Sequence, residues 1–77
     1  MPLRPSQVET LRAVGKMTER FARASTGYVA MQCGISEAAA HRRCARLEAR
    51  RLLASTFAER RVWFSLTQLG REALEES

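Results

Sequence analysis

The chain of 77 residues has no aspartate, no asparagine, one lysine and one histidine. It has only two cysteines, eleven positions apart, and this number excludes a disulfide framework. No stretch approaches the ~20 consecutive apolar residues that a membrane-spanning helix needs. The first residues, MPLRPSQ, contain no apolar segment of the kind found in a secretory signal. We therefore expect a cytoplasmic protein without a membrane segment.

Motifs of catalytic sites are also missing. The sequence has no glycine-rich phosphate loop, no His-Glu-x-x-His and no Ser/His/Asp set in a familiar context. Cys33, His41 and Cys44 could suggest a metal site, but a tetrahedral site would lack its fourth ligand. Both cysteines fall at apolar helix positions, where a free thiol packs as a small hydrophobic group. We expect no enzyme, cofactor or metal, and a redox role of the thiols is left open.

Positive charge is concentrated in one quarter of the chain. Residues 42–61 contain only two glutamates and hold the whole net charge of +5, while the rest of the chain sums to zero. The arginines of this stretch are Arg42, Arg43, Arg46, Arg50, Arg51, Arg60 and Arg61. A GC-rich genome also produces many arginines, so their number alone proves nothing. Their segregation favours a polyanionic partner, provided that they lie on one surface.

The N-terminal third predicts a helix followed by an ambiguous segment. After an irregular arm at 1–5, Ser6 and Glu9 have the spacing of a capping box, and apolar residues follow at helical spacing. A first helix is therefore expected over 6–16. Residues 17–24 fit either a short strand or a longer helix, and we favour a short extended segment.

Two further helices are predicted on either side of a sharp turn at Gly34. A second helix over 26–33 begins after a serine or threonine cap and ends at this glycine, which suits a left-handed conformation. Ser36 can cap a third helix over 37–51, with a glutamate in its first turn and arginines in its last, as the helix dipole favours. One side of this third helix is apolar, and the opposite side is basic and rich in alanine.

The C-terminal third predicts a hairpin and a closing helix. Two runs of β-forming residues within 52–66 are joined by a charged tip at 58–61. Thr67 can cap a last helix over 68–76. The expected fold class is mainly α with a small β-hairpin (α+β), in one domain over 1–77. Its parts are a three-helix core, the hairpin and a C-terminal helix.

This order of elements resembles a winged helix-turn-helix. The segment STGYVAMQCGISEAAAHRRCARLEARRLL is similar to the tri-helical core of that superfamily, with its turn at 34–36. The segment RRVWFSLTQLGREAL is similar to the second wing strand and final helix of MarR-, PadR- and ArsR-like regulators, including the motif L-T-x-x-G-x-x-x-L. The resemblance covers 25–74 and implies a minimal single-domain member. Long flanking helices and a complete metal motif are missing, so the resemblance does not extend to ligand sensing.

The basic side of the third helix is predicted to contact bases. The major groove of DNA admits one α-helix, provided that the face pointing inward is slim and carries hydrogen-bond donors. Arg42 and Arg46 can present guanidinium forks to guanine, and Ala38 or Ala39 can lie against a thymine methyl group. These four residues are the candidates for base readout.

Three residues near this side are predicted to contact phosphates. Arg43 and Arg50 lie off the groove-facing side, and Ser36 lies at a helix N-terminus with free amide donors. An intrahelical ion pair of Arg43 with Glu48 is the alternative for this arginine, and capping alone is the alternative for Ser36.

The hairpin adds two arginines and a tryptophan to the candidates. Arg60 and Arg61 resemble wing residues that enter a minor groove, whose narrow form attracts arginine, and the alternative is a solubilising turn. Trp63 is expected to point away from the apolar face of its strand. It either packs against the helix at 37–51 or marks a surface for a protein partner.

These features together predict a sequence-specific, bacterial-type transcriptional regulator that binds double-stranded DNA, acting as a repressor or an activator. A homodimer is expected, because such regulators usually contact two half-sites, and a monomer is left open. The alternative function is a winged-helix module for protein–protein interaction that acts as an adaptor or as an inhibitor of a regulator.

Overall fold

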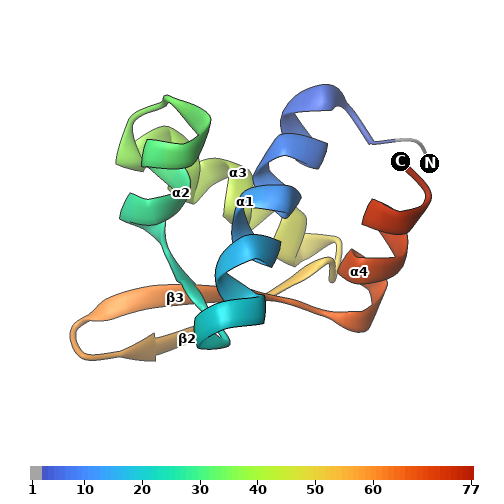
Figure 1. Ribbon diagram of the computed structural model, residues 1–77. Helices are drawn as coiled ribbons and strands as arrows, with labels where there is room; N and C mark the ends of the chain where they lie inside the picture. Colours follow the sequence, from blue (N-terminus) through green and yellow to red (C-terminus); the bar gives the residue numbers. More distant parts are fainter. Residues whose placement is uncertain (1–2) are drawn as a thin grey trace.

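The computed structural model describes residues 3–77, which form four helices and three strands. In chain order these are α1 (Pro5–Phe21), β1 (Ala24–Ser25), α2 (Thr26–Cys33), α3 (Glu37–Ala49), β2 (Leu53–Ala58), β3 (Arg61–Leu66) and α4 (Gln68–Glu75). The turn of the β2–β3 hairpin lies at the opposite end of the molecule from α4 (Figure 1). No helix within 3–77 has the length and apolar composition to cross a bilayer. The expected fold class, mainly α with a small β-hairpin, is confirmed.

The three strands form one antiparallel sheet in the order β1-β3-β2. β2 and β3 pair along their whole length, as the hairpin prediction required. β1 is an addition that was not predicted as part of the sheet: Ala24 and Ser25 pair with Phe64 and Trp63 of β3. The central position of β3 therefore ties the chain after α1 to the hairpin.

The side chains of the core come from α1, α2, α3 and the hairpin. The largest fully buried side chains include Phe64, Leu11, Leu47, Leu53, Val14 and Val29. Phe64 is 1% exposed, and its ring meets the ring of His41 in α3 edge-on at a centroid distance of 6.1 Å. Burying one side chain of this size contributes roughly 1.5–3 kcal/mol. Phe64 thus fixes α3 against the sheet.

Helix α1 begins earlier than predicted. Pro5 takes the first helical position, for which the fixed φ of proline is well suited. The backbone N–H of Arg4 donates a hydrogen bond to Oε1 of Gln7 at 2.9 Å. This contact takes the place of the predicted capping box of Ser6 and Glu9. Of the irregular arm predicted at 1–5, Pro5 is therefore helical, and residues 1–2 lie outside the described part of the chain.

Helix α1 also ends later than predicted, at Phe21 instead of residue 16. Gly15 does not end the helix, because it is buried within it, and a Cβ at this position would lie 3.1 Å from the Leu66 side chain. The residue after the helix end, Ala22, is its C-cap and has a left-handed φ of 68°. The extended segment predicted at 17–24 is wrong except at its last residue, which starts β1.

Helix α3 ends at Ala49 and not at residue 51, because Arg51 adopts a left-handed φ of 65°. This reversal turns Leu52 back toward the core, where its side chain is 9% exposed. The N–H of Leu52 bonds the carbonyl oxygen of Leu47 at 3.0 Å, which satisfies one of the last carbonyls of the helix.

The hairpin occupies 53–66 instead of 52–66, because Leu52 belongs to the turn that follows α3. Its turn consists of Glu59 and Arg60, whose φ values of 54° and 65° are both positive. Two-residue turns of this kind match the twist of a hairpin and usually contain asparagine and glycine. Other residues in this conformation cost roughly 1–2 kcal/mol each. The tip is therefore narrow, and strained at two charged residues.

Helix α4 stops at Glu75, one residue before the predicted end, and is attached to the α3–β2 connection through Thr67. The Thr67 hydroxyl accepts from the Gly70 N–H at 3.0 Å and donates to the Arg51 carbonyl at 2.6 Å. The Gly70 backbone lies so close to Leu52 that a Cβ would sit 2.1 Å from the Leu52 carbonyl oxygen. In the L-T-x-x-G motif, the threonine thus caps α4, and the glycine allows α4 to lie close to the Leu52 backbone.

Candidate nucleic-acid interface

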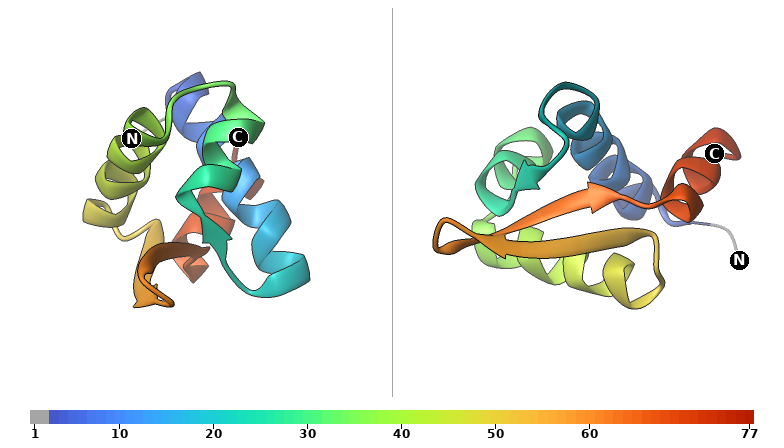
Figure 2. Two further views of the ribbon diagram at one scale, coloured as in Figure 1. Left: turned by 90° about the vertical axis from the view of Figure 1, so that its left-hand side faces the viewer. Right: turned by 90° about the horizontal axis from the view of Figure 1, so that it is seen from below.

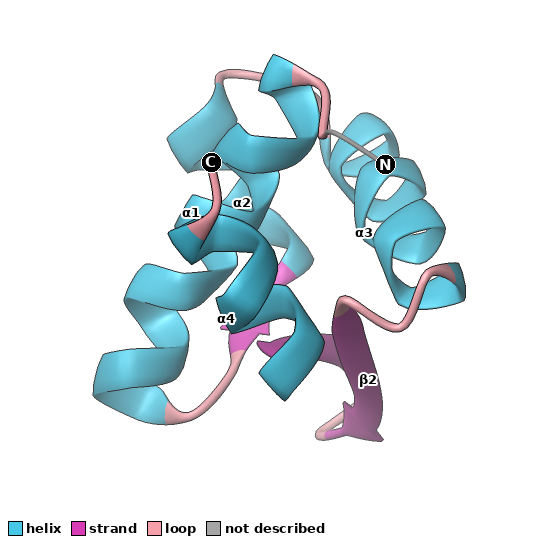
Figure 3. Ribbon diagram, turned by 90° about the vertical axis from the view of Figure 1, so that its right-hand side faces the viewer, coloured by secondary structure: helices cyan, strands magenta, loops and turns pink. Residues whose placement is uncertain are grey.

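The outer face of α3 is basic and slim. Burial of Ala40, Cys44 and Leu47 on the inner side fixes the orientation of the helix. The exposed residues on the opposite side are Ala38, Arg42, Ala45, Arg46 and Ala49. Helix α3 stands at one side of the molecule (Figure 3). The outer face is therefore open to a partner.

The arginines on this face are available for contacts with a ligand. Within 3–77, neither Arg42 nor Arg46 forms an ion pair with an acidic residue. Of the four residues predicted for base readout, Ala38, Arg42 and Arg46 are exposed together, while Ala39 is half-buried on the flank. Ser36 caps α3, and its hydroxyl accepts from the Ala39 N–H at 3.1 Å. The capping role of this serine is thus present in the fold.

Arg43 and Arg50 lie on the flank of α3 that faces α1. The Nη1 atom of Arg43 lies 3.6 Å from Oε1 of Glu9 in α1, so its ion pair forms with Glu9 and not with Glu48. Glu48 lies on the other flank and accepts a hydrogen bond from the Ser55 hydroxyl of β2. The two flanks of α3 are therefore fixed by α1 on one side and by the sheet on the other.

The hairpin forms a second basic element beside α3. Seen from below, α3 and β2 run side by side, and the hairpin turn protrudes beyond the helices (Figure 2). Arg60 and Arg61 lie at this tip and are exposed. The basic segment of the sequence thus folds into two neighbouring elements, as a helix and a wing.

Trp63 lies against residues that hold the wing in place. The guanidinium carbon of Arg23 is 4.2 Å from the centroid of the Trp63 ring, and that of Arg61 is 5.9 Å away. The ring nitrogen donates to the Ala58 carbonyl at 3.0 Å. Arg23 also pairs with Oε1 of Glu59 in the turn at 3.2 Å. We call Arg23, Glu59 and Trp63 the wing latch.

Sequence reasoning missed the contact of Arg23 with the wing. This arginine directly precedes β1, and it reaches the wing only because β1 pairs with β3. A two-residue strand leaves almost no periodic signal, so its pairing partner could not be predicted from the local pattern.

The cysteines provide no metal site with their neighbours. Within 3–77, no group of three or more histidine, cysteine or acidic side chains is placed to hold a metal ion. Burial raises the pKa of the Cys44 thiol to about 12, with a smaller contribution from Cys33. Burial is also the main cause that raises the pKa of Cys33, and Glu9 adds to it. Both thiols are therefore poor nucleophiles at neutral pH.

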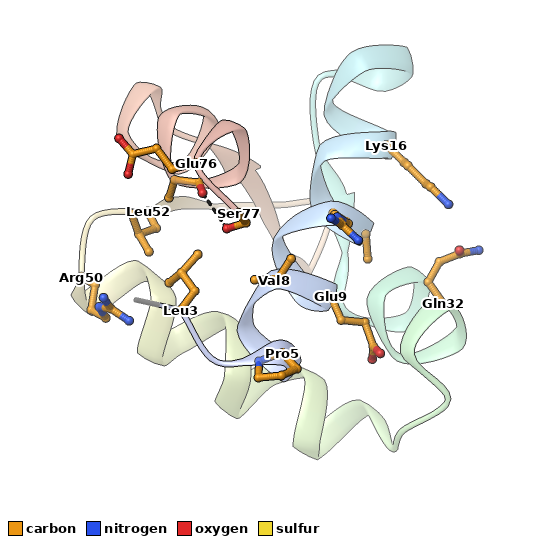
Figure 4. A pocket seen from close by; sticks show the side chains of 13 residues that line it. Leu3, Pro5, Val8, Glu9, Lys16, Gln32, Arg50, Leu52, Glu76 and Ser77 are labelled. Carbon is orange, nitrogen blue, oxygen red and sulfur yellow. Dashed lines mark hydrogen bonds between the residues drawn. The ribbon is translucent and has the colours of Figure 1, made fainter. Parts of the chain in front are cut away.

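A separate open cleft of about 920 Å³ lies between α1 and α4 (Figure 4). Its lining mixes apolar side chains such as Val8 and Leu52 with the charged side chains of Arg12, Lys16 and Glu76. None of the residues on the outer face of α3 lines this cleft, which is therefore distinct from the basic face.

Comparison with known proteins identifies the fold. No protein-family model and no curated protein matches the chain. Among solved structures, BpsR of Bordetella bronchiseptica is 31% identical, with a TM-score of 0.80 over 96% of this chain and 52% of that chain. Its structure addresses the regulation of its DNA binding by 6-hydroxynicotinic acid. A MarR family protein from Bacillus stearothermophilus is 20% identical, with a TM-score of 0.78 over 99% of this chain and 51% of that chain.

MepR, a transcription regulator of the Staphylococcus aureus multidrug efflux pump MepA, has a TM-score of 0.80 at 17% identity, over 96% of this chain and 54% of that chain. The chain thus spans about half the length of these structures. At their low identities, the MarR family protein and MepR show the fold alone. The fold is the winged helix-turn-helix of DNA-binding transcriptional regulators.

Proposed function

We propose that this winged helix-turn-helix chain binds duplex DNA in a sequence-specific manner as a transcriptional regulator. The observation that carries this proposal is the outer face of α3, where Arg42 and Arg46 are exposed among alanines and have no acidic partner within 3–77. The major groove is about 12 Å wide and accepts a helix with such a slim face. Helix α3 then lies in the major groove, and the wing contacts the adjacent minor groove or the backbone.

Each group of basic residues has its own role in this complex. Arg42 and Arg46 donate to base edges, with Ala38 and Ala39 close to thymine methyl groups. The contacts to phosphates come from Ser36, Arg43 and Arg50, and those at the minor groove come from Arg60 and Arg61. Arg43 exchanges its ion pair with Glu9 for a phosphate when DNA is bound.

We further propose that two copies bind one operator with two half-sites, because a two-fold symmetric dimer matches such a sequence. The surface of α4, and the part of α1 that lines a cleft with it, do not belong to the outer face of α3 and remain for the dimer contact. Sedimentation of the complex with a selected duplex tests this point. Two chains per duplex support the proposal, and one chain per duplex contradicts it.

Titration of duplex DNA at several salt concentrations tests DNA binding itself. If binding neutralises about five phosphates per chain, a plot of log affinity against log salt concentration is expected to have a slope near −4.5. A flat salt dependence would contradict the proposal, because it would show that the basic face does not meet the phosphate backbone. A single strand of the same length serves as the control, and we expect weaker binding to it.

A further inference from the structure

Four arginines line one recess between the start of α1 and the flank of α3. The recess has a volume of about 410 Å³. Its polar lining comes from Arg4, Ser6, Gln7, Arg43, Arg46 and Arg50. No acidic side chain of residues 3–77 is part of the lining. The recess is therefore a concentrated positive site with hydrogen-bond donors.

Most of this charge is not compensated within the described chain. Only Arg43 has an acidic partner, Glu9, at 3.6 Å. The atom of Arg43 that lies nearest to Glu9, Nη1, is buried, and at this distance it forms no hydrogen bond among residues 3–77. Like charges held together at a protein surface repel one another, and an anion between them removes this cost. The recess is thus electrostatically suited to a group with a negative charge and several acceptor oxygens.

Gln7 holds two sides of the recess in place. Its Oε1 atom accepts from the backbone N–H of Arg4 at 2.9 Å, and Nη1 of Arg50 lies 3.5 Å from the same oxygen. Arg4 at the cap of α1 and Arg50 at the end of α3 are thereby brought to one site from distant parts of the sequence. An anion would meet donors that are already positioned.

We propose that this recess binds a phosphate group, and that its occupant is a phosphodiester of the DNA strand on the α1 side of the major groove. This inference rests on the proposed function. His41 and Glu48 on one flank of α3 contact the sheet, while Arg43 and Arg50 on the other flank face α1. A helix in the major groove has one sugar-phosphate strand on each side. The recess holds the strand on the α1 side, and Arg4 joins the DNA contacts.

The salt dependence of duplex binding tests this site with matched variants. Arg4→Gln and Arg71→Gln each remove one exposed arginine, the first from the recess and the second from α4. Arg4→Gln is expected to make the slope of log affinity against log salt shallower by about 0.9, equally on all duplex sequences. Arg71→Gln is expected to leave the slope unchanged. Arg50→Gln serves as a second recess variant and is expected to match Arg4→Gln.

An unchanged slope in both recess variants would overturn the inference, and so would an equal change in Arg71→Gln, which would indicate an effect of net charge alone. Both results leave the proposed function intact if the wild type binds duplex DNA. Failure of the wild type to bind any duplex contradicts the proposed function itself. The two failures are therefore distinguishable.

Titration followed by NMR distinguishes the sources of the phosphate group. Stoichiometric duplex DNA is expected to shift the backbone amide signals of Ser6 and Gln7 and the side-chain Nε–H signal of Arg50. Inorganic phosphate alone is expected to shift them only weakly, without saturation at millimolar concentrations. Saturation at micromolar phosphate would assign the recess to a small free anion and overturn the DNA contact.

Discussion

The guanidinium carbon of Arg23 lies 4.2 Å from the centroid of the Trp63 ring, and a nitrogen of the same group lies 3.2 Å from Oε1 of Glu59. Arg23 belongs to the link between α1 and β1, whereas its two partners belong to the hairpin. An exposed cation–π contact contributes about 0.5–1 kcal/mol, and an exposed ion pair contributes roughly 0–1 kcal/mol. The wing latch therefore adds little stability, but it fixes the direction of the wing.

Replacing Arg23 is expected to loosen the wing without unfolding the protein. Arg23→Ala should lower the free energy of unfolding by about 1 kcal/mol and move the Trp63 emission to longer wavelength, because the ring gains contact with water. Duplex affinity should fall, because the wing must then be ordered on binding. Urea unfolding and fluorescence measure these effects. Arg20→Ala, at an exposed arginine in the last turn of α1, is the control. An unchanged Trp63 emission in Arg23→Ala would contradict the latch.

Arg60→Gly is expected to act in opposite directions on stability and on DNA binding. Glycine relieves the left-handed φ of 65° at this position and should raise stability by about 1 kcal/mol. The lost charge should make the salt slope of duplex binding shallower by about 0.9. Thermal unfolding and salt titration measure the two effects. A loss of stability would contradict the strained turn, and an unchanged slope would remove Arg60 from the interface.

Two glycine-to-alanine variants separate a steric requirement from a conformational one. Gly70→Ala would place a Cβ 2.1 Å from the Leu52 carbonyl oxygen, so α4 must shift, at a cost of about 1–3 kcal/mol or more. Gly34→Ala meets no atom within 4 Å, and only its φ of 67° opposes the change, at roughly 1–2 kcal/mol. Urea unfolding of both variants should show the larger loss for Gly70→Ala. The reverse order would contradict the close approach of α4 to Leu52.

The raised pKa of Cys44 predicts a loss of stability in alkaline solution. Burial raises the pKa of this thiol from its ordinary value of 9.0 to about 12 in the folded protein. Its contribution is thus fully present below pH 9 and is lost as pH rises from 9 toward 12, by at most about 1.4 kcal/mol per pH unit. Cys44→Ala should show a weaker pH dependence of the free energy of unfolding across this range. Identical slopes in variant and wild type would contradict a protonated, buried thiol.

Arg42→Ala is expected to reduce discrimination between bases more than it reduces general affinity. A lost bidentate contact with guanine costs about 1–3 kcal/mol at one base pair. Fluorescence anisotropy with an operator duplex and with duplexes changed at single positions measures this cost. Uniform weakening on every duplex would instead assign Arg42 to a phosphate contact.

The sequence predicts those features that depend on neighbouring residues. Ser25, Ser36 and Thr67 each cap a helix by accepting from an amide three residues ahead, so their signals are local. The buried side of α3, and hence its outer face, follows from helical spacing.

Features that depend on distant contacts could not be predicted. Glycine is typical of a helix end, yet Gly15 lies within α1 and packs against Leu66, far along the chain. Arg51 ends α3 only because the next residue is buried in the core. The same holds for the basic residues, since the positions of Arg43 and Arg50 are set by Glu9 and Gln7 of α1. Spacing along one helix carries no information about a neighbouring helix.

Selection of bound duplexes from a random pool, followed by measurement of affinity for the selected and for a scrambled duplex at one salt concentration, tests the central claim most directly. For a sequence-specific regulator that uses the outer face of α3, we expect one enriched sequence and an affinity ratio of about 10³ or more. No enrichment, with a ratio near one, would contradict sequence-specific recognition.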